Sequence, residues 1–160
     1  MDSAELTSDS AAATERAAEA VADELRPGEV VLVSGDVGVG KSTFVRGACR
    51  ALGVRERVTS PSFTIGRRYE GRIPVSHLDL FRLETLSGED PGLLSDYLTP
   101  DAITFVEWPQ AALPELEPRS VVLRVRLVHL GGDRRSIEAS GASALVRRLR
   151  DALAGDRAVG

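Results

Sequence analysis

The sequence is poor in the residues that build disulfides and zinc sites. It has one cysteine, Cys49, and two histidines among 160 residues. A single thiol cannot form an internal disulfide, and no Cys/His cluster has zinc-site spacing. Basic residues number 20 against 24 acidic ones, which gives a formal net charge of −4. This balance argues against broad, non-specific binding to nucleic acid.

Long hydrophobic runs are absent too. The longest, such as Val30–Val33, fall far short of the roughly 20 residues that a membrane-spanning helix needs. The N-terminus is acidic and lacks the basic and apolar segments of a secretory signal. We therefore expect a cytoplasmic protein with no membrane partner.

What is present fits an ordinary folded domain. Hydrophobic residues make up 42% and charged residues 28% of the chain, which is typical of globular proteins. A chain of 160 residues can bury an adequate core without disulfides. We expect one domain over residues 1–160, with about the first eight and the last six residues unordered.

The hydrophobic pattern predicts helices alternating with strands. The predicted helices are 11–26, 41–52, a short one around 93–98, and 142–153. The predicted strands are 30–33, a hairpin between 57 and 83 that turns at Glu70-Gly71, 103–106, 121–130 and 136–139. Cys49 falls on the apolar side of its helix and is interpreted as a core residue. Together these elements predict a three-layer α/β fold with a mostly parallel central sheet and added antiparallel strands.

The segment Gly35–Ser42 (GDVGVGKS) matches the phosphate-binding pattern G-x-x-x-x-G-K-[ST]. It lies between a predicted buried strand and a predicted helix, the context that the pattern requires. Its glycines let successive backbone N–H groups turn inward around an anion, and the helix N-terminus adds positive potential. Lys41, the only lysine beside 19 arginines, would contact the β- and γ-phosphates, and Ser42 would bind Mg²⁺. The pattern predicts a P-loop NTPase-like fold.

Two acidic residues follow predicted strands and are candidates for the remaining chemistry. Asp79 ends one strand of the hairpin, and Glu107 follows the strand 103–106. A P-loop enzyme needs such a carboxylate to hold the metal or to orient the attacking water. His77 alternates with Asp79 along one strand face, and we interpret it as a structural hydrogen-bonding residue.

The motif alone leaves three functions open. A Ras-like GTPase is excluded, because its [NT]-K-x-D element needs a second lysine. An ATPase, a small-molecule kinase and a nucleotide-switched binding module all remain. The segment 84–102 is short for the substrate site and lid of a kinase, which favours the ATPase.

Four elements together resemble a known family. They are Gly35–Thr43, Ser60–Thr64 (SPSFT), His77–Leu83 (HLDLFRL) and Val106–Pro109 (VEWP), in order and spacing over roughly residues 10–150. This combination is similar to the TsaE (YjeE) family. The resemblance implies an Mg²⁺-dependent ATPase that is weak alone and supports a complex of TsaB and TsaD. That complex makes threonylcarbamoyladenosine next to the tRNA anticodon; hydrolysis would reset it, and tRNA would be contacted only indirectly.

The resemblance also implies roles for individual residues. Ser60–Thr64 would be a switch segment that senses the γ-phosphate, and Trp108, otherwise a plain core anchor, would lie beside the site. No motif marks the adenine contacts, for which the candidates are residues near Ser8–Ser10 and Arg134 or Arg135, with Arg134 chosen. The catalytic residues are Lys41, Asp79 and Glu107, and the metal ligands are Ser42 and Glu107. The ATP- or ADP-binding residues are Gly35, Asp36, Gly38, Val39, Gly40, Lys41, Ser42, Thr43, Ser62, Thr64, Trp108 and Arg134.

Overall fold

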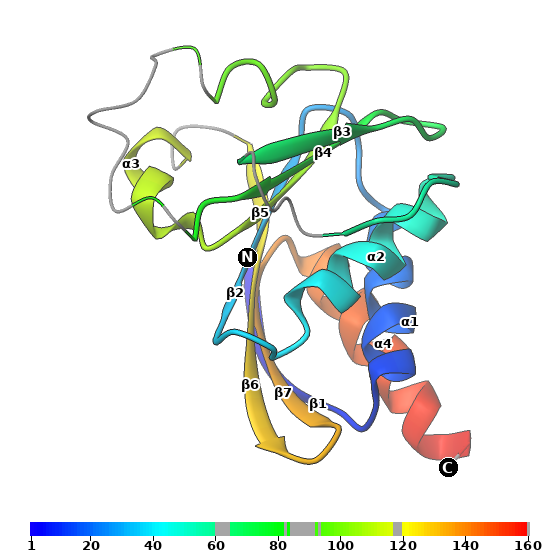
Figure 1. The fold of residues 1–160 in the computed structure, drawn as a ribbon. Coiled ribbons are helices and arrows are strands. Elements are labelled where there is room, and N and C mark those ends of the chain that lie inside the picture. The colour runs from blue at the N-terminus through cyan, green and yellow to red at the C-terminus, as the bar shows by residue number, and fades with distance from the viewer. Residues whose placement is uncertain (60–64, 82, 84–91, 93, 117–119, 160) are drawn as a thin grey trace.

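The computed structural model describes residues 1–59, 65–81, 83, 92, 94–116 and 120–159. Figure 1 shows their arrangement, in which strands and helices alternate along the N-terminal part of the chain. The elements are β1 (Asp2–Ser8), α1 (Ala11–Ala22), β2 (Val30–Gly35), α2 (Lys41–Ala51), β3 (Gly66–Tyr69), β4 (Val75–Asp79), β5 (Ile103–Glu107), the 3₁₀ helix η1 (Pro109–Ala112), α3 (Leu113–Leu116), β6 (Val121–Gly131), β7 (Arg134–Gly141) and α4 (Ser143–Val159).

One seven-stranded sheet organises the molecule. Its strand order is β1-β7-β6-β2-β5-β4-β3. The four central strands run parallel, since β2 pairs in parallel with both β5 and β6, and β4 pairs in parallel with β5. The outer strands β3, β7 and β1 pair antiparallel with their neighbours. The expected mixed α/β fold, parallel in the centre with antiparallel additions, is confirmed.

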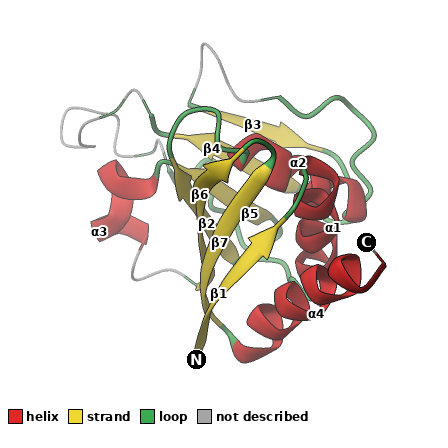
Figure 2. Cartoon of the chain, turned by 90° about the horizontal axis from the view of Figure 1, so that it is seen from below, coloured by secondary structure: helices red, strands yellow, loops and turns green. Residues whose placement is uncertain are grey.

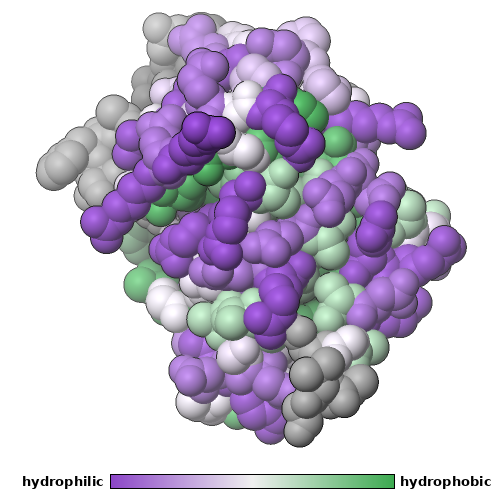
Figure 3. All heavy atoms as spheres, turned by 90° about the vertical axis from the view of Figure 1, so that its right-hand side faces the viewer, coloured by the Kyte–Doolittle hydropathy of each residue, from purple (hydrophilic) through white to green (hydrophobic). Residues whose placement is uncertain are grey.

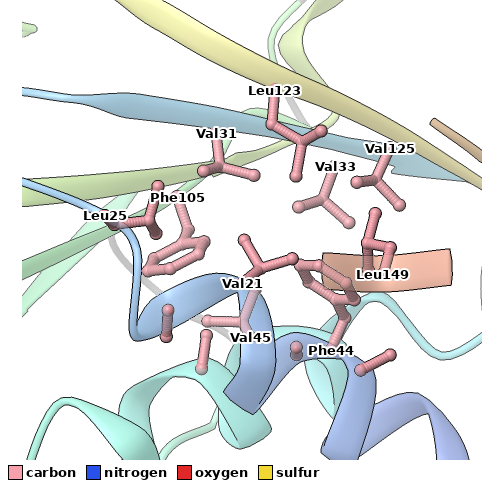
Figure 4. Packing of buried hydrophobic residues seen from close by; sticks show 14 of the residues in the cluster. Val21, Leu25, Val31, Val33, Phe44, Val45, Phe105, Leu123, Val125 and Leu149 are labelled. Atoms are coloured by element: carbon pink, nitrogen blue, oxygen red, sulfur yellow. The ribbon is translucent and has the colours of Figure 1, made fainter. Parts of the chain in front are cut away.

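Helices cover the two faces of the sheet unequally. Figure 2 shows α1, α2 and α4 on one side of the sheet, with α3 on the other. The larger core lies under the three long helices, where Val31 and Val33 of β2 meet Phe44 of α2 and Leu149 of α4 (Figure 4). A smaller core on the opposite face joins Leu32 to η1 and α3. β2 is buried on both faces of the sheet, and this is why its apolar residues form a continuous run and do not alternate with polar ones.

The outer surface of the long helices is mainly hydrophilic, as Figure 3 shows for the side of the molecule that carries them. Ion pairs cross this surface, among them Arg50 with Glu15 at 2.6 Å and Arg148 with Glu24 at 2.5 Å. Within the described residues, no helix has both the length and the apolar character needed to cross a bilayer. Cys49 is fully buried, and burial raises the pKa of its thiol to about 12, in keeping with a core role.

The N-terminal residues form a strand where the sequence predicts an unordered segment. The first residues form β1, which pairs with β7 over seven positions and turns Ala4 and Leu6 toward the main core. Ala4 and Leu6 are the two residues of this strand that contact the core, and two apolar positions are too few for the alternating pattern of a strand to be recognised in the sequence. At the other end the backbone of α4 stays helical to Val159.

Two further local predictions need correction. The short helix expected around 93–98 is a run of turns over 94–97, held by the N–H of Leu98 bonded to the carbonyl of Leu94 at 2.8 Å. The helix predicted over 11–26 ends at Ala22, and η1 with α3 was not predicted. Four-residue helices carry too few apolar positions for a period to be read.

Candidate nucleotide site

The loop between β2 and α2 has the backbone of an anion cradle. Gly38 and Gly40 have φ angles of 77° and 111°, in the left-handed region that favours glycine. At Gly35 a Cβ atom would lie 2.5 Å from the carbonyl oxygen of Leu127, so this position also excludes a side chain. Gly40 is the N-cap of α2, whose first residue is Lys41. The free N–H groups of that helix therefore face the loop.

Lys41 is folded back onto its own loop. Its Nζ donates to the carbonyl oxygens of Gly35 at 2.8 Å and Asp36 at 2.9 Å. It also lies 4.4 Å from the centroid of the Trp108 ring. Only 6% of the residue is exposed. Burial lowers the pKa of Lys41, while the negative charges of Glu107, Asp79 and Asp36 partly oppose that shift.

The sheet brings the two predicted acids together. Asp79 ends β4 and Glu107 ends β5, and the two residues are register partners. Glu107 is also paired with Val33 of β2, two residues before Gly35. Because these strands are parallel, their carboxyl ends meet at one edge of the sheet, the edge where ligands bind in open α/β sheets.

The two acids have different surroundings. Glu107 is 2% exposed, and its Oε2 lies 2.5 Å from Nε2 of His77. Asp79 is half-buried, and its Oδ1 accepts the backbone N–H of Phe81 at 3.0 Å. Burial raises the pKa of Asp79 above its ordinary value of 3.8, and the negative charge of Glu107 adds to that shift. The bond from Phe81 and the charges of His77 and Lys41 act in the opposite direction.

We expect the Asp79→Asn variant to be more stable than the wild type at pH 7 without nucleotide. The raised pKa means that ionising Asp79 costs more in the folded than in the unfolded state, so stability falls as pH rises through that pKa. Solvent screens a half-buried carboxylate, so the gain should stay below about 1 kcal/mol. Thermal unfolding from pH 7 to pH 4 should show the difference narrowing as the pH falls.

The control for that experiment is Asp101→Asn. A hydrogen bond from Thr99, together with Arg68, lowers the pKa of Asp101, so the expected sign is reversed. A stability gain at Asp79 that does not change with pH would contradict the electrostatic explanation.

A cavity of about 350 Å³ opens at this edge of the sheet. Its rim is partly apolar: Phe81 is 56% and Val37 71% exposed. The rings of Phe81 and Trp108 lie 4.9 Å apart at an angle of 51°. Trp108 has a φ of 54°, which is rare for a bulky residue, and backbone strain of this kind is found more often at functional sites than elsewhere. The lining residues are Val37, Gly38, Gly40, Lys41, Ser42, Thr43, Asp79, Phe81, Glu107 and Trp108.

The donor atoms at the cavity suit a hard divalent cation. Ser42 brings a hydroxyl, and Asp79 and Glu107 bring carboxylates. Over the described ranges, no three His, Cys, Asp or Glu side chains form a group that could hold a metal by themselves. Mg²⁺ does not need such a group, because it is commonly bound by one or two protein oxygens together with phosphate and water. The residues therefore fit a magnesium ion that arrives with a nucleotide.

The structure brings eight predicted residues to the cavity and places others elsewhere. Gly35, Asp36 and Val39 shape the loop without lining the cavity, and Ser62 and Thr64 lie outside the described residues. Those at the cavity are Gly38, Gly40, Lys41, Ser42, Thr43, Asp79, Glu107 and Trp108.

Arg134, chosen for adenine, is also absent from the cavity lining. It pairs with Asp9 at 3.5 Å. The neighbouring Arg135 contacts the phosphate loop, because its Nε donates to the carbonyl of Val39 at 2.8 Å. Arg135 is among the residues named for adenine, but neither its contact with Val39 nor the apolar rim was predicted, and the chain offers no motif that marks them.

Comparisons with a family model and with known proteins all give matches to one family, TsaE. The family model described as "Threonylcarbamoyl adenosine biosynthesis protein TsaE" matches residues 8–137. The Synechocystis protein named tRNA threonylcarbamoyladenosine biosynthesis protein TsaE is 40% identical over 115 residues, 65% of this chain and 68% of that one. Its Bacillus subtilis namesake is 38% identical over 113 residues, 70% and 69% of the two chains.

Among solved structures, Bacillus subtilis YdiB has a similar fold. The TM-score is 0.69, and the match covers 98% of this chain and 97% of that one at 24% identity.

Proposed function

This chain belongs to the TsaE family of tRNA threonylcarbamoyladenosine biosynthesis proteins, and from that premise we propose that it is an Mg²⁺-dependent ATPase. One observation carries the proposal: Asp79 and Glu107 end adjacent parallel strands beside a complete phosphate loop. We further propose that the chain acts as one domain and that its hydrolysis supports a TsaB–TsaD complex in the cytoplasm.

The residues of the loop would bind the triphosphate. Backbone N–H groups of the loop and of the first turn of α2 donate to phosphate oxygens. Lys41 leaves the carbonyls of Gly35 and Asp36 and donates to the β- and γ-phosphates. Ser42 and Glu107 would hold Mg²⁺, which when bound neutralises charge on the phosphates.

Asp79 would act on the attacking water. Its half-buried carboxylate lines the cavity, and its raised pKa makes it a better proton acceptor than an exposed aspartate. It would accept a hydrogen bond from the water and orient that water toward the γ-phosphate. The bond from the N–H of Phe81 fixes one carboxylate oxygen, so that the carboxylate cannot rotate freely.

The open mouth of the cavity supports dependence on a partner. Exposed Phe81 and Val37 stand at the rim next to Trp108, an apolar edge suited to a protein contact. Lys41 is the only cation among the described lining residues. Many phosphoryl-transfer sites gain a second cation from another protein. We propose that the TsaB–TsaD complex covers this rim, that hydrolysis resets the complex, and that tRNA is reached only through it.

Phosphate release by the purified chain tests the proposal. Turnover of Mg²⁺·ATP should be slow for the chain alone and should rise by at least about tenfold with the TsaB–TsaD complex. TsaB–TsaD without this chain measures the background. Equal, rapid turnover with and without the complex would contradict partner dependence, and absence of Mg²⁺·ATP binding in both conditions would contradict the ATPase assignment itself.

A further inference from the structure

The closest polar contact at the site joins Glu107 to a residue outside the cavity lining. His77 lies in β4, and its register partner in β5 is Phe105, two residues before Glu107. Side chains two residues apart on a strand share one face, so His77 and Glu107 are diagonal neighbours. Nε2 of His77 lies 2.5 Å from Oε2 of Glu107, and His77 is fully buried.

The residues around His77 are mainly apolar, so an apolar side chain at this position would stabilise the fold at least as well as an imidazole. Val75 and Phe105 on the same face belong to the main hydrophobic core. Nδ1 of His77 is buried and has no hydrogen-bond partner in the part of the chain that is described. A buried ring nitrogen without a partner is unfavourable, and an apolar side chain would avoid that cost. The contact that explains a histidine at this position is therefore the one with Glu107.

The contact determines which atoms of Glu107 are engaged. An ionised carboxylate can only accept hydrogen bonds, so in this contact Nε2 of His77 donates to Oε2 of Glu107. With Oε2 held by His77, Oε1 is the oxygen left for a ligand. Glu107 contributes to the cavity lining, whereas His77 does not.

We propose that His77 is a positioning residue that holds one oxygen of Glu107, so that the other oxygen is presented to Mg²⁺. This inference rests on the proposed function. Partners of this kind fix the orientation of metal-binding side chains, and their loss typically weakens metal binding by about 10–100-fold. Without His77, the Glu107 carboxylate would be free to move toward the Lys41 ammonium, whose charge it already attracts.

The test measures metal binding directly, with Mn²⁺ as a paramagnetic probe for the Mg²⁺ site. Electron paramagnetic resonance titration of the ADP complex gives the Mn²⁺ dissociation constant. We expect His77→Leu to weaken Mn²⁺ binding by about 10–100-fold. ADP affinity in EDTA should stay within about twofold, because the phosphate loop is unchanged.

Two conservative variants separate positioning from packing. In His77→Gln the amide nitrogen can take the place of Nε2, so Mn²⁺ affinity should return to within about threefold of the wild type. In His77→Asn the shorter side chain does not reach Glu107, and binding should stay weak. His129→Leu, which replaces the exposed histidine of β6, is the matched control and should leave Mn²⁺ affinity unchanged. If His77→Leu does not fold, the Gln and Asn variants decide the question.

The outcomes distinguish this inference from its premise. Normal Mn²⁺ affinity in folded His77→Leu or His77→Asn, with weakened affinity in Glu107→Gln, would overturn the positioning role and leave the proposed function intact. No Mn²⁺ binding by the wild-type ADP complex would instead overturn the metal site itself.

Discussion

Lys41→Met should lower partner-stimulated ATP hydrolysis by about 10²–10³-fold, the loss typical when one preorganised charge donor is removed. Methionine keeps the length of the side chain but has no group that can donate to the β- and γ-phosphates. The fold should survive, since removing a buried ammonium also removes its desolvation cost. Phosphate release with TsaB–TsaD present would measure the loss of turnover, and thermal unfolding would measure whether the fold survives.

Arg46→Met is the matched control. Arg46 lies on the same helix, α2, and pairs with Glu15 at 3.6 Å away from the phosphate loop. Arg46→Met removes one positive charge, as Lys41→Met does, but at an exposed site away from the phosphate loop. Turnover should therefore stay within about twofold of the wild type. If both variants lost activity equally, the effect would come from net charge on α2 and not from the phosphate clamp.

Glu107→Gln should separate binding from chemistry. Glutamine keeps the volume of the side chain and can still accept the N–H of His77, but it lacks the negative charge that a magnesium ligand needs. We expect turnover to fall by at least about 10²-fold, because charge stabilisation in the transition state depends on the metal. ATP affinity in EDTA should change by less than about threefold, since the loop and Lys41 provide that contact.

Single-turnover phosphate release and calorimetry with and without Mg²⁺ would measure these two quantities. Glu138→Gln is the control. Glu138 lies on β7, forms an ion pair with Arg126 of β6 at 3.1 Å, and does not line the nucleotide cavity. Normal turnover by Glu107→Gln would remove Glu107 from the metal site and make Asp79 the acid to test next.

The phosphate loop and its acids were accessible from the sequence because both depend on short-range patterns. Spacing within Gly35–Ser42 determines the loop, and the acids follow apolar runs that are readable as strands. The sheet order, in which β5 lies between β2 and β4, then places Asp79 and Glu107 side by side. The sequence predicted each acid at a strand end but not the distance between them.

The contacts that were missed are tertiary. The His77–Glu107 contact depends on the register of β4 against β5, and the Arg135–Val39 contact joins residues 96 positions apart. A local pattern carries no information about either. Trp108 is a related case, since its left-handed backbone lies at the turn from β5 into η1 and no glycine in the sequence marks it.

The two hydrogen bonds from Lys41 to Gly35 and Asp36 have a consequence for the free energy of ligand binding. These bonds connect the two ends of the loop Gly35–Lys41, here called the arch, in the absence of bound phosphate. The conformational entropy of ordering the arch is therefore lost during folding and not during binding. We therefore expect Lys41 to exchange the two carbonyl acceptors for phosphate oxygens on nucleotide binding, with little further ordering of the loop.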